Sequence, residues 1–284
     1  MEDKDMIQLA QLGFDYGPKA VVFNGLTLNI PQGRSVGVLG ANGVGKTTLI
    51  KLISGMVSPT QGSVSVLGSN PRLRPLALYQ QMYVVPEEST LPSISALKYI
   101  QSFSVFYPAF NHALCTKMLE QFSVDLHKSL QKMSLGQKKK FIVSFALATG
   151  CQLILMDEPT NGLDIPSKAL FREIVIEHQR EDQTLLICTH QVKDLESIID
   201  SVVMMNEAHA LWIDLGELPR FVSQVSGAQS DTQVLYSEKR LGADISLIKG
   251  TTQQPTDIDL EILFNTFHTN YSGLNDAIST GATR

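Results

Sequence analysis

The chain has 284 residues, of which 43% are hydrophobic and 18% charged, so it can form one large domain or two modest ones around a buried core. Its formal net charge of −5 argues against nucleic acid as a partner, because sequence-independent binding to phosphates requires a basic surface. The three cysteines show no Cys-x-x-Cys spacing, and no apolar run reaches the roughly 20 residues that span a bilayer, so neither a cysteine metal site nor a membrane helix is expected.

The N-terminal third is expected to begin with antiparallel strands. Residues 6–30 alternate apolar and polar side chains around a Tyr-Gly-Pro break at 16–18, which predicts a β-hairpin. Residues 35–40 predict a short buried strand that ends in glycine, and a helix is expected to start near Lys46. Turn residues followed by alternation in 57–68 predict further antiparallel strand.

A glycine-rich segment joins the predicted strand to the predicted helix. It reads GANGVGKTT and matches the pattern G-x-x-x-x-G-K-[ST]. Its glycines let backbone N–H groups point at phosphate oxygens, and the helix N-terminus adds partial positive charge at the same place. Its lysine would bind the β- and γ-phosphates, and the first threonine hydroxyl would bind Mg²⁺. The predicted nucleotide site comprises Gly40, Ala41, Asn42, Gly43, Val44, Gly45, Lys46, Thr47 and Thr48. No Asn-Lys-x-Asp guanine reader occurs, so a GTPase is not expected.

A helical block follows at about residues 89–150, where apolar residues recur every three or four positions. Ser134 is followed three residues later by Gln137, a capping-box pattern that predicts the start of the last helix of this block. The lysines at 138–140 are interpreted as a solvated helix face. The three predicted helical stretches are 95–106, 111–122 and 135–148.

After residue 150, near-continuous apolar runs alternate with a helical pattern, as expected for parallel strands covered on both faces. Asp157 and Glu158 directly follow the first run. Asp157 would hold Mg²⁺ through water beside Thr47, and Glu158 would polarise the attacking water. A solvated strand end is the alternative interpretation. The predicted strands are 153–156, 185–188 and 202–205, with a crossover helix at 167–180 and an amphipathic helix at 257–268.

Three motifs together resemble the ATP-binding subunits of ABC transporters: GANGVGKTT, MSLGQKK and LILMDEPTNGLD, in the family's order and over about residues 6–220. The resemblance implies an α/β fold with a P-loop NTPase (RecA-like) core, an N-terminal antiparallel β subdomain and an inserted helical subdomain at about 88–150. It assigns residues 1–220 to the ATPase domain and 221–284 to a C-terminal extension.

The resemblance also implies a site completed by a second subunit. Asp164 matches an acidic residue of the loop that crosses the dimer interface, although it could equally cap the helix after Pro166. Leu135 stands where the family usually has glycine, and a plain helix cap is the alternative for this whole segment. The residues expected to bind the γ-phosphate held by the other subunit are Ser134, Leu135, Gly136 and Gln137.

Three further residues take roles from the resemblance. Tyr16 lies where the family has an aromatic residue that stacks on adenine, a core or hairpin tyrosine being the alternative. His190 matches the switch histidine that contacts the γ-phosphate, so Glu158 and His190 are the expected catalytic residues. Glu87, in the segment YVVPEE, stands at a position where the family usually has glutamine, and its role as Mg²⁺ ligand, hinge or neither stays open.

The function implied is that of an ATP-binding and ATP-hydrolysing subunit that uses ATP and Mg²⁺ and closes as a head-to-tail dimer around two ATP molecules. It would drive a separate transmembrane permease docked near residues 87–110, from the cytoplasmic face of the membrane. Homodimer and heterodimer both stay open. FYPAF at 106–110 and the polar tail look like subunits of antibiotic- and drug-export systems. Alternatives are a soluble mechanical ATPase of translation or DNA repair, and a regulatory module that binds ATP without hydrolysing it.

Overall fold

The fold centres on a six-stranded sheet of order β5-β6-β7-β3-β8-β9, in which all neighbours are parallel except β8 and β9. The computed structural model describes residues 5–17, 20–207, 209–227, 233–241, 243–251 and 257–279. The strands are β3 (Ser35–Gly40), β5 (Met82–Val85), β6 (Leu153–Asp157), β7 (Thr184–Thr189), β8 (Ser201–Met205) and β9 (Ala210–Asp214). The three apolar runs predicted as parallel strands are thereby confirmed.

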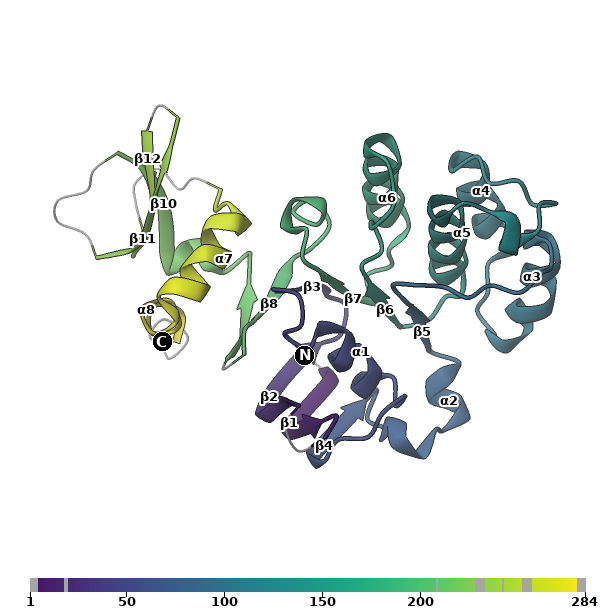
Figure 1. The fold of residues 1–284 in the computed structure, drawn as a ribbon, viewed down its shortest axis with the longest axis horizontal. Helices are drawn as coiled ribbons and strands as arrows, with labels where there is room; N and C mark the ends of the chain where they lie inside the picture. The colour runs from purple at the N-terminus through teal and green to yellow at the C-terminus, as the bar shows by residue number, and fades with distance from the viewer. Residues whose placement is uncertain are drawn as a thin grey trace.

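Both faces of this sheet are covered, which explains why its strands read as continuous apolar runs. Along β7, Leu185 and Ile187 belong to one hydrophobic cluster, whereas Leu186 and Cys188 belong to the other. Helices α5 and α6 lie on one side of the sheet, and α1 with the N-terminal strands lies on the other (Figure 1). The bounds of these helices are α1 (Lys46–Ile53), α5 (Leu135–Ala148) and α6 (Ile165–His178).

The N-terminal strands form a separate antiparallel sheet of order β2-β1-β4. Its strands are β1 (Asp5–Asp15), β2 (Val21–Pro31) and β4 (Gln61–Val66), so the predicted hairpin and the predicted third strand are both confirmed. Pro18 of the predicted turn lies outside the described residues. Leu12 and Phe23 of this sheet join the cluster that also contains Leu49 of α1. This packing holds the start of α1 beside the N-terminal sheet.

The predicted helical block is confirmed and lies beyond the β5 edge of the central sheet (Figure 1). Tyr99, Phe141 and Phe145 form an aromatic cluster at its centre. The solvated-face interpretation of the lysine run is wrong for Lys139, which is only 3% exposed. The block and the segment before it comprise η1 (Pro71–Leu73), α2 (Leu76–Tyr79), α3 (Ala96–Phe103), η2 (Ser104–Phe106), α4 (His112–Gln121), η3 (Leu130–Lys132) and α5.

The C-terminal elements form a third sheet of order β10-β12-β11 and two helices at the other end of the molecule (Figure 1). Leu263 and Phe267 of the first helix are fully buried in the same cluster as Ile187 of the central sheet. None of the described helices combines the length and hydrophobicity needed to cross a bilayer. The C-terminal elements are η5 (Leu218–Arg220), β10 (Val222–Ser226), β11 (Val234–Arg240), β12 (Ala243–Lys249), α7 (Leu260–Thr269) and α8 (Tyr271–Ser279). A further short helix, η4 (Val192–Asp194), lies between β7 and β8.

Candidate nucleotide-binding site

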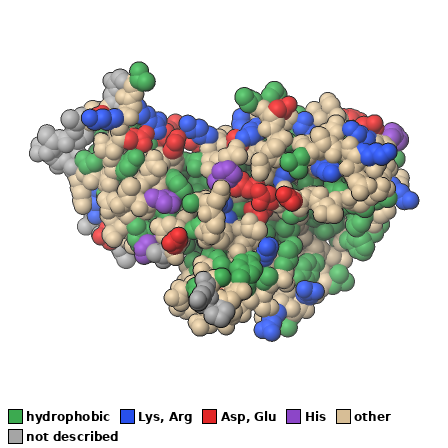
Figure 2. Space-filling view, in the orientation of Figure 1, with side chains coloured by type: hydrophobic (Ala, Val, Ile, Leu, Met, Phe, Trp, Pro, Cys, Tyr) green, Lys and Arg blue, Asp and Glu red, His purple; other side chains and the backbone are tan. Residues whose placement is uncertain are grey.

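A cleft of about 580 Å³ opens where β3, β6 and β7 end and α1 begins. Parallel strands bring their carboxyl ends to one edge of a sheet, which is where open α/β sheets bind ligands. Acidic side chains gather in the middle of the face seen in Figure 2. The cleft is lined by Tyr16, Val22, Asn42, Gly43, Gly45, Lys46, Thr47, Thr48, Glu87, Asp157, Glu158, Asn161 and His190.

The glycine-rich loop leads directly into α1, whose N-cap residue Gly45 has a φ of 108°. A Cβ at Gly45 would come within 2.7 Å of a methyl carbon of Val22 and 2.9 Å of the Phe23 ring, so the loop requires glycine there. The Lys46 side chain is only 7% exposed and donates to the carbonyl oxygens of Gly40 (2.8 Å) and Ala41 (3.1 Å). The loop therefore places one cation and the first free N–H groups of α1 at the floor of the cleft.

Thr47 and Asp157 come together from positions 110 residues apart in the sequence. The Thr47 hydroxyl donates to Asp157 Oδ2 at 2.7 Å, and Asp157 is only 3% exposed. Burial raises the pKa of this carboxyl, while the hydrogen bond from Thr47 and the charge of Lys46 act in the opposite direction. A hydroxyl and a carboxylate oxygen side by side are suitable ligands for a hard cation such as Mg²⁺.

Glu158 points away from Asp157 and toward the end of β7. Its Oε2 accepts a 2.7 Å hydrogen bond from the Thr189 hydroxyl, and its Oε1 accepts the backbone N–H of His190 at 3.0 Å. The same Oε1 lies 2.7 Å from Nδ1 of the His190 ring. Glu158 has a φ of 45°, a left-handed conformation that non-glycine residues rarely adopt. Such strained residues concentrate at functional sites, and here the strain turns the carboxylate toward His190.

Tyr16 lies at the rim of the cleft and is 57% exposed, so it is not a core tyrosine. Its hydroxyl lies 3.2 Å from the Thr48 hydroxyl, and its ring packs edge-on against Phe14 with the ring centroids 4.9 Å apart. The aromatic face is therefore supported on one side and accessible to a ligand. Glu87 also lines the cleft, on the loop that follows β5.

The segment Ser134–Gln137 does not line this cleft. Ser134 is exposed, and its hydroxyl accepts the Gln137 N–H at 3.2 Å while the Gln137 side chain accepts the Ser134 N–H, so the predicted capping box is present. Leu135 is 54% exposed, and Gly136 lies between it and Gln137 at the start of α5. This helix N-terminus is thus open to a second molecule.

Asp164 also lies outside the cleft, at the start of α6. Its side chain accepts the Ser167 N–H at 2.9 Å and caps the helix, and this hydrogen bonding lowers the pKa of the carboxyl. The segment before Asp164 meets the start of α5, since a Cβ on Gly162 would come within 2.9 Å of the Leu135 side chain. Ser134–Gln137 and Asp164 therefore lie together on a surface outside the cleft.

Three residues at or near the cleft were not predicted from the sequence. Thr189 holds Glu158, Asn161 lines the cleft, and Lys139 approaches it from α5. Thr189 directly precedes His190 and Asn161 lies within LILMDEPTNGLD, so the sequence indicated their positions but not their contacts. Lys139 is the last residue of MSLGQKK, but nothing in the sequence indicates that it is buried, because it lies between two other lysines.

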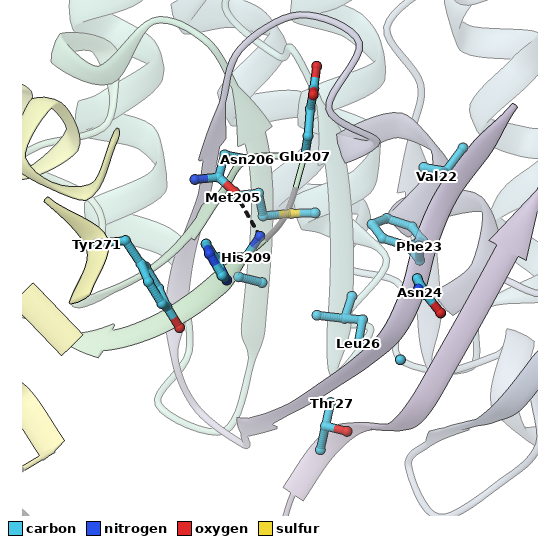
Figure 3. Close-up of a pocket in the computed structure, with 12 residues that line it drawn as sticks. Val22, Phe23, Asn24, Leu26, Thr27, Met205, Asn206, Glu207, His209 and Tyr271 are labelled. Carbon is cyan, nitrogen blue, oxygen red and sulfur yellow. Dashed lines mark hydrogen bonds between the residues drawn. The ribbon is translucent and has the colours of Figure 1, made fainter. Parts of the chain in front are cut away.

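A second pocket, of about 360 Å³, lies on the other side of Val22, which lines both cavities. In Figure 3, His209 faces Tyr271 of α8, and their stacked rings have centroids 3.9 Å apart. Asn24 and Thr27 line this pocket from β2. The pocket therefore joins the C-terminal helices to the N-terminal sheet.

The chain is similar to known proteins over most of its length. The sequence profile of the ABC transporter family matches residues 23–161. The ABC transporter ATP-binding protein NatA of Bacillus subtilis is 29% identical over 194 residues, which cover 66% of this chain and 79% of that protein. The bacitracin transport ATP-binding protein BcrA of Enterococcus faecalis is 29% identical over 210 residues, which cover 72% of this chain and 67% of that protein.

Solved structures show the same fold. An ATP-binding subunit of an ABC transporter superposes with a TM-score of 0.67 at 23% identity and covers 76% of this chain and 92% of its own. The profile match and the relatives agree: residues 23–161 match the ABC transporter family, and the chain is similar to ABC transporter ATP-binding proteins, a family whose members hydrolyse ATP.

Proposed function

We propose that this chain is the ATP-hydrolysing subunit of a membrane transporter and that the cleft is its catalytic site. The observation that carries the proposal is the convergence of Lys46, the Thr47–Asp157 pair and the Glu158–His190 pair on one cavity. The loop and Lys46 would hold the phosphates of ATP, and the accessible ring of Tyr16 would stack on adenine. The loop residues in this role are Gly40, Ala41, Asn42, Gly43, Val44, Gly45, Lys46, Thr47 and Thr48.

Mg²⁺ fits the cleft through Thr47 and Asp157. The described residues contain no cluster of three or more His, Cys, Asp or Glu side chains that could hold a metal ion. Mg²⁺ is commonly bound by one or two protein ligands and the phosphates of its substrate, which is the arrangement proposed here. When bound it neutralises phosphate charge. Glu87 is a third candidate oxygen ligand, because it lines the same cleft.

Glu158 is proposed as the residue that orients and polarises the attacking water. Its carboxylate is 5% exposed and held by Thr189 and His190, so it is pre-oriented. His190 would position Glu158 and contact the γ-phosphate. The regulatory alternative, binding without hydrolysis, is disfavoured because this pair is intact.

Two copies would close head to tail around two ATP molecules. The exposed N-terminus of α5 supplies the second surface, since free helix N–H groups and the Ser134 hydroxyl suit an anion. The γ-phosphate would bridge the two chains, so hydrolysis would release the dimer. The residues proposed to contact the partner's nucleotide are Ser134, Leu135, Gly136 and Gln137, with Asp164 at the interface.

A transmembrane permease is the proposed second partner, which would place this chain on the cytoplasmic face of the membrane. A pocket of about 470 Å³ between α2, β5 and α3 is lined by Arg74, Tyr79 and Tyr99, among other residues. Val105 and Phe106 are exposed in η2, which follows α3 directly. This surface coincides with the docking region expected near residues 87–110. The similarity to a bacitracin transport subunit supports an antibiotic- or drug-export system. Residues 1–220 would form the ATPase domain and 221–284 an extension.

Glu158→Gln is the test of this function. The variant should bind ATP as the wild type does, lose turnover by about a hundredfold or more because the water is no longer polarised, and dimerise when ATP is added. ATP titration, phosphate release and light scattering measure the three properties, and Lys46→Ala, which should lose ATP affinity, is the comparison. A monomer with wild-type ATPase activity in Glu158→Gln would defeat the proposal.

A further inference from the structure

Lys139 is a buried lysine near the start of α5. It is only 3% exposed, whereas its neighbours Lys138 and Lys140 are partly exposed. Lysine is almost never fully buried without partners, because an ammonium group loses its hydration on burial. The position therefore requires specific compensating contacts.

Those contacts are with the loop that follows β5. The Lys139 ammonium donates to the carbonyl oxygen of Glu87 at 2.7 Å and to that of Pro86 at 3.2 Å. Burial lowers the pKa of Lys139, and the negative charges of Glu87, Asp157 and Glu158 oppose this effect. Lys139 is therefore held by two backbone carbonyls and lies in the field of the acidic groups of the cleft.

The same helix carries the exposed surface proposed to meet a second subunit. Ser134 caps α5, and Lys139 follows five residues later on the same rigid element. Glu87, at the other end of the contact, lines the nucleotide cleft of its own chain. One side chain thus connects the start of α5 to a loop at the cleft.

We propose that Lys139 is a positioning residue that couples the two ATP sites of the dimer. Contact of the partner's nucleotide with the N-terminus of α5 shifts the helix, and Lys139 carries the shift to the Glu87 loop beside the chain's own nucleotide. The inference rests on the proposed function, since it requires a dimer with ATP at Ser134. A purely structural role would instead affect folding and nucleotide affinity along with turnover.

Lys139→Met removes the donor and keeps the length of the side chain. We expect kcat to fall by about tenfold or more, while the Kd for ATP in the monomer stays within about twofold of the wild type. Lys139→Gln restores one neutral donor and should give an intermediate kcat. In the Glu158→Gln background, Lys139→Met should raise the ATP concentration needed for dimerisation by about tenfold. Lys138→Met, on the same helix turn, is the control and should leave all three values unchanged.

The outcomes separate this inference from the function on which it depends. A wild-type protein that does not hydrolyse ATP defeats the proposed function. An active wild type with an unaffected kcat in Lys139→Met overturns the coupling role alone. A Lys139→Met variant whose ATP affinity falls in proportion to kcat also overturns the coupling role. If Lys139→Met does not fold, as judged by thermal unfolding, Lys139→Gln decides: a reduced kcat with unchanged affinity supports the role, and a wild-type kcat overturns it.

Discussion

At the scale of single residues, the two adjacent acids after β6 are given different environments by their backbone. Asp157 continues the strand and accepts a hydrogen bond from Thr47. Glu158 adopts a left-handed conformation that turns its side chain toward Thr189 and His190. Each carboxylate has its own hydrogen-bond donors, which lessens the repulsion that two neighbouring charges would otherwise produce.

Asp157→Asn should stabilise the protein in the absence of nucleotide and Mg²⁺. Because burial raises the pKa of Asp157, the folded protein binds a proton more tightly than the unfolded chain does. Ionisation of Asp157 therefore destabilises the folded protein fully at a pH above the raised pKa. This destabilisation disappears as the pH falls toward 3.8, the ordinary pKa of an aspartate. An uncharged amide avoids this destabilisation, so Tm should rise at pH 7, with a smaller difference near pH 4.

Thermal unfolding at both pH values measures this effect. Asp164→Asn is the matched control, because the pKa of Asp164 is lowered at its exposed helix cap and neutralisation brings no gain there. With ATP and Mg²⁺ present, the wild type should have the higher Tm, since the Asp157→Asn variant loses a proposed metal ligand. A lower Tm for Asp157→Asn without nucleotide at pH 7 would contradict the argument.

At the scale of elements, three helices of the helical block begin with the same N-cap hydrogen bond. The side chains of Ser95, Asn111 and Ser134 each accept a backbone N–H three residues later, at the starts of α3, α4 and α5. The cap stabilises each helix locally, but only at α5 do we propose that the same residue also binds a partner's nucleotide. Comparing substitutions at these N-cap residues can therefore separate an effect on stability from an effect on function.

Ser134→Ala and Ser95→Ala should cost similar stability and differ in activity. Each removes one capping hydrogen bond, so each should lower the free energy of unfolding by about 1 kcal/mol. Only Ser134→Ala should reduce ATP-dependent dimerisation and turnover, because Ser95 caps α3, which carries none of the residues proposed to contact the partner's nucleotide. Urea unfolding and phosphate release give the two quantities. Equal ATPase activity in the two variants would refute a role of Ser134 beyond capping.

At the scale of the whole molecule, the C-terminal elements are packed onto the segment that carries His190. Lys193 of η4 lies 3.2 Å from Glu261 of α7, and Phe267 is completely buried in the cluster that contains Ile187 of β7. Tyr271 stacks on His209 next to the N-terminal sheet. These contacts lead us to expect that the C-terminal helices unfold together with the core.

Phe267→Ala should lower the free energy of unfolding by about 3–5 kcal/mol, the usual cost of emptying a buried phenylalanine site. Phe264→Ala, one turn earlier and only partly buried, should cost clearly less. Urea unfolding followed by Trp212 fluorescence in β9 and by far-UV circular dichroism should show one shared transition. An early, separate loss of α7 and α8 would show that the extension is independent of the core.

The sequence by itself determined most of the secondary structure and the chemistry of the cleft. Continuous apolar runs predict strands buried on both faces, and the glycine-rich loop carries in its own residues the bend that we propose to bind phosphate, because both depend on neighbours in the chain. The capping box at Ser134 is equally local. The resemblance to the transporter family came from the same short motifs.

Only the tertiary structure decided which distant residues meet. The contact of Thr47 with Asp157, the hold of Thr189 on Glu158 and the burial of Lys139 against Glu87 join segments 110, 31 and 52 residues apart. The sheet order brings the first two pairs together, and the packing of α5 against the loop after β5 makes the third. Such contacts depend on the arrangement of whole elements, which local periodicity does not encode, and so a lysine that looks solvated in its run became a buried one.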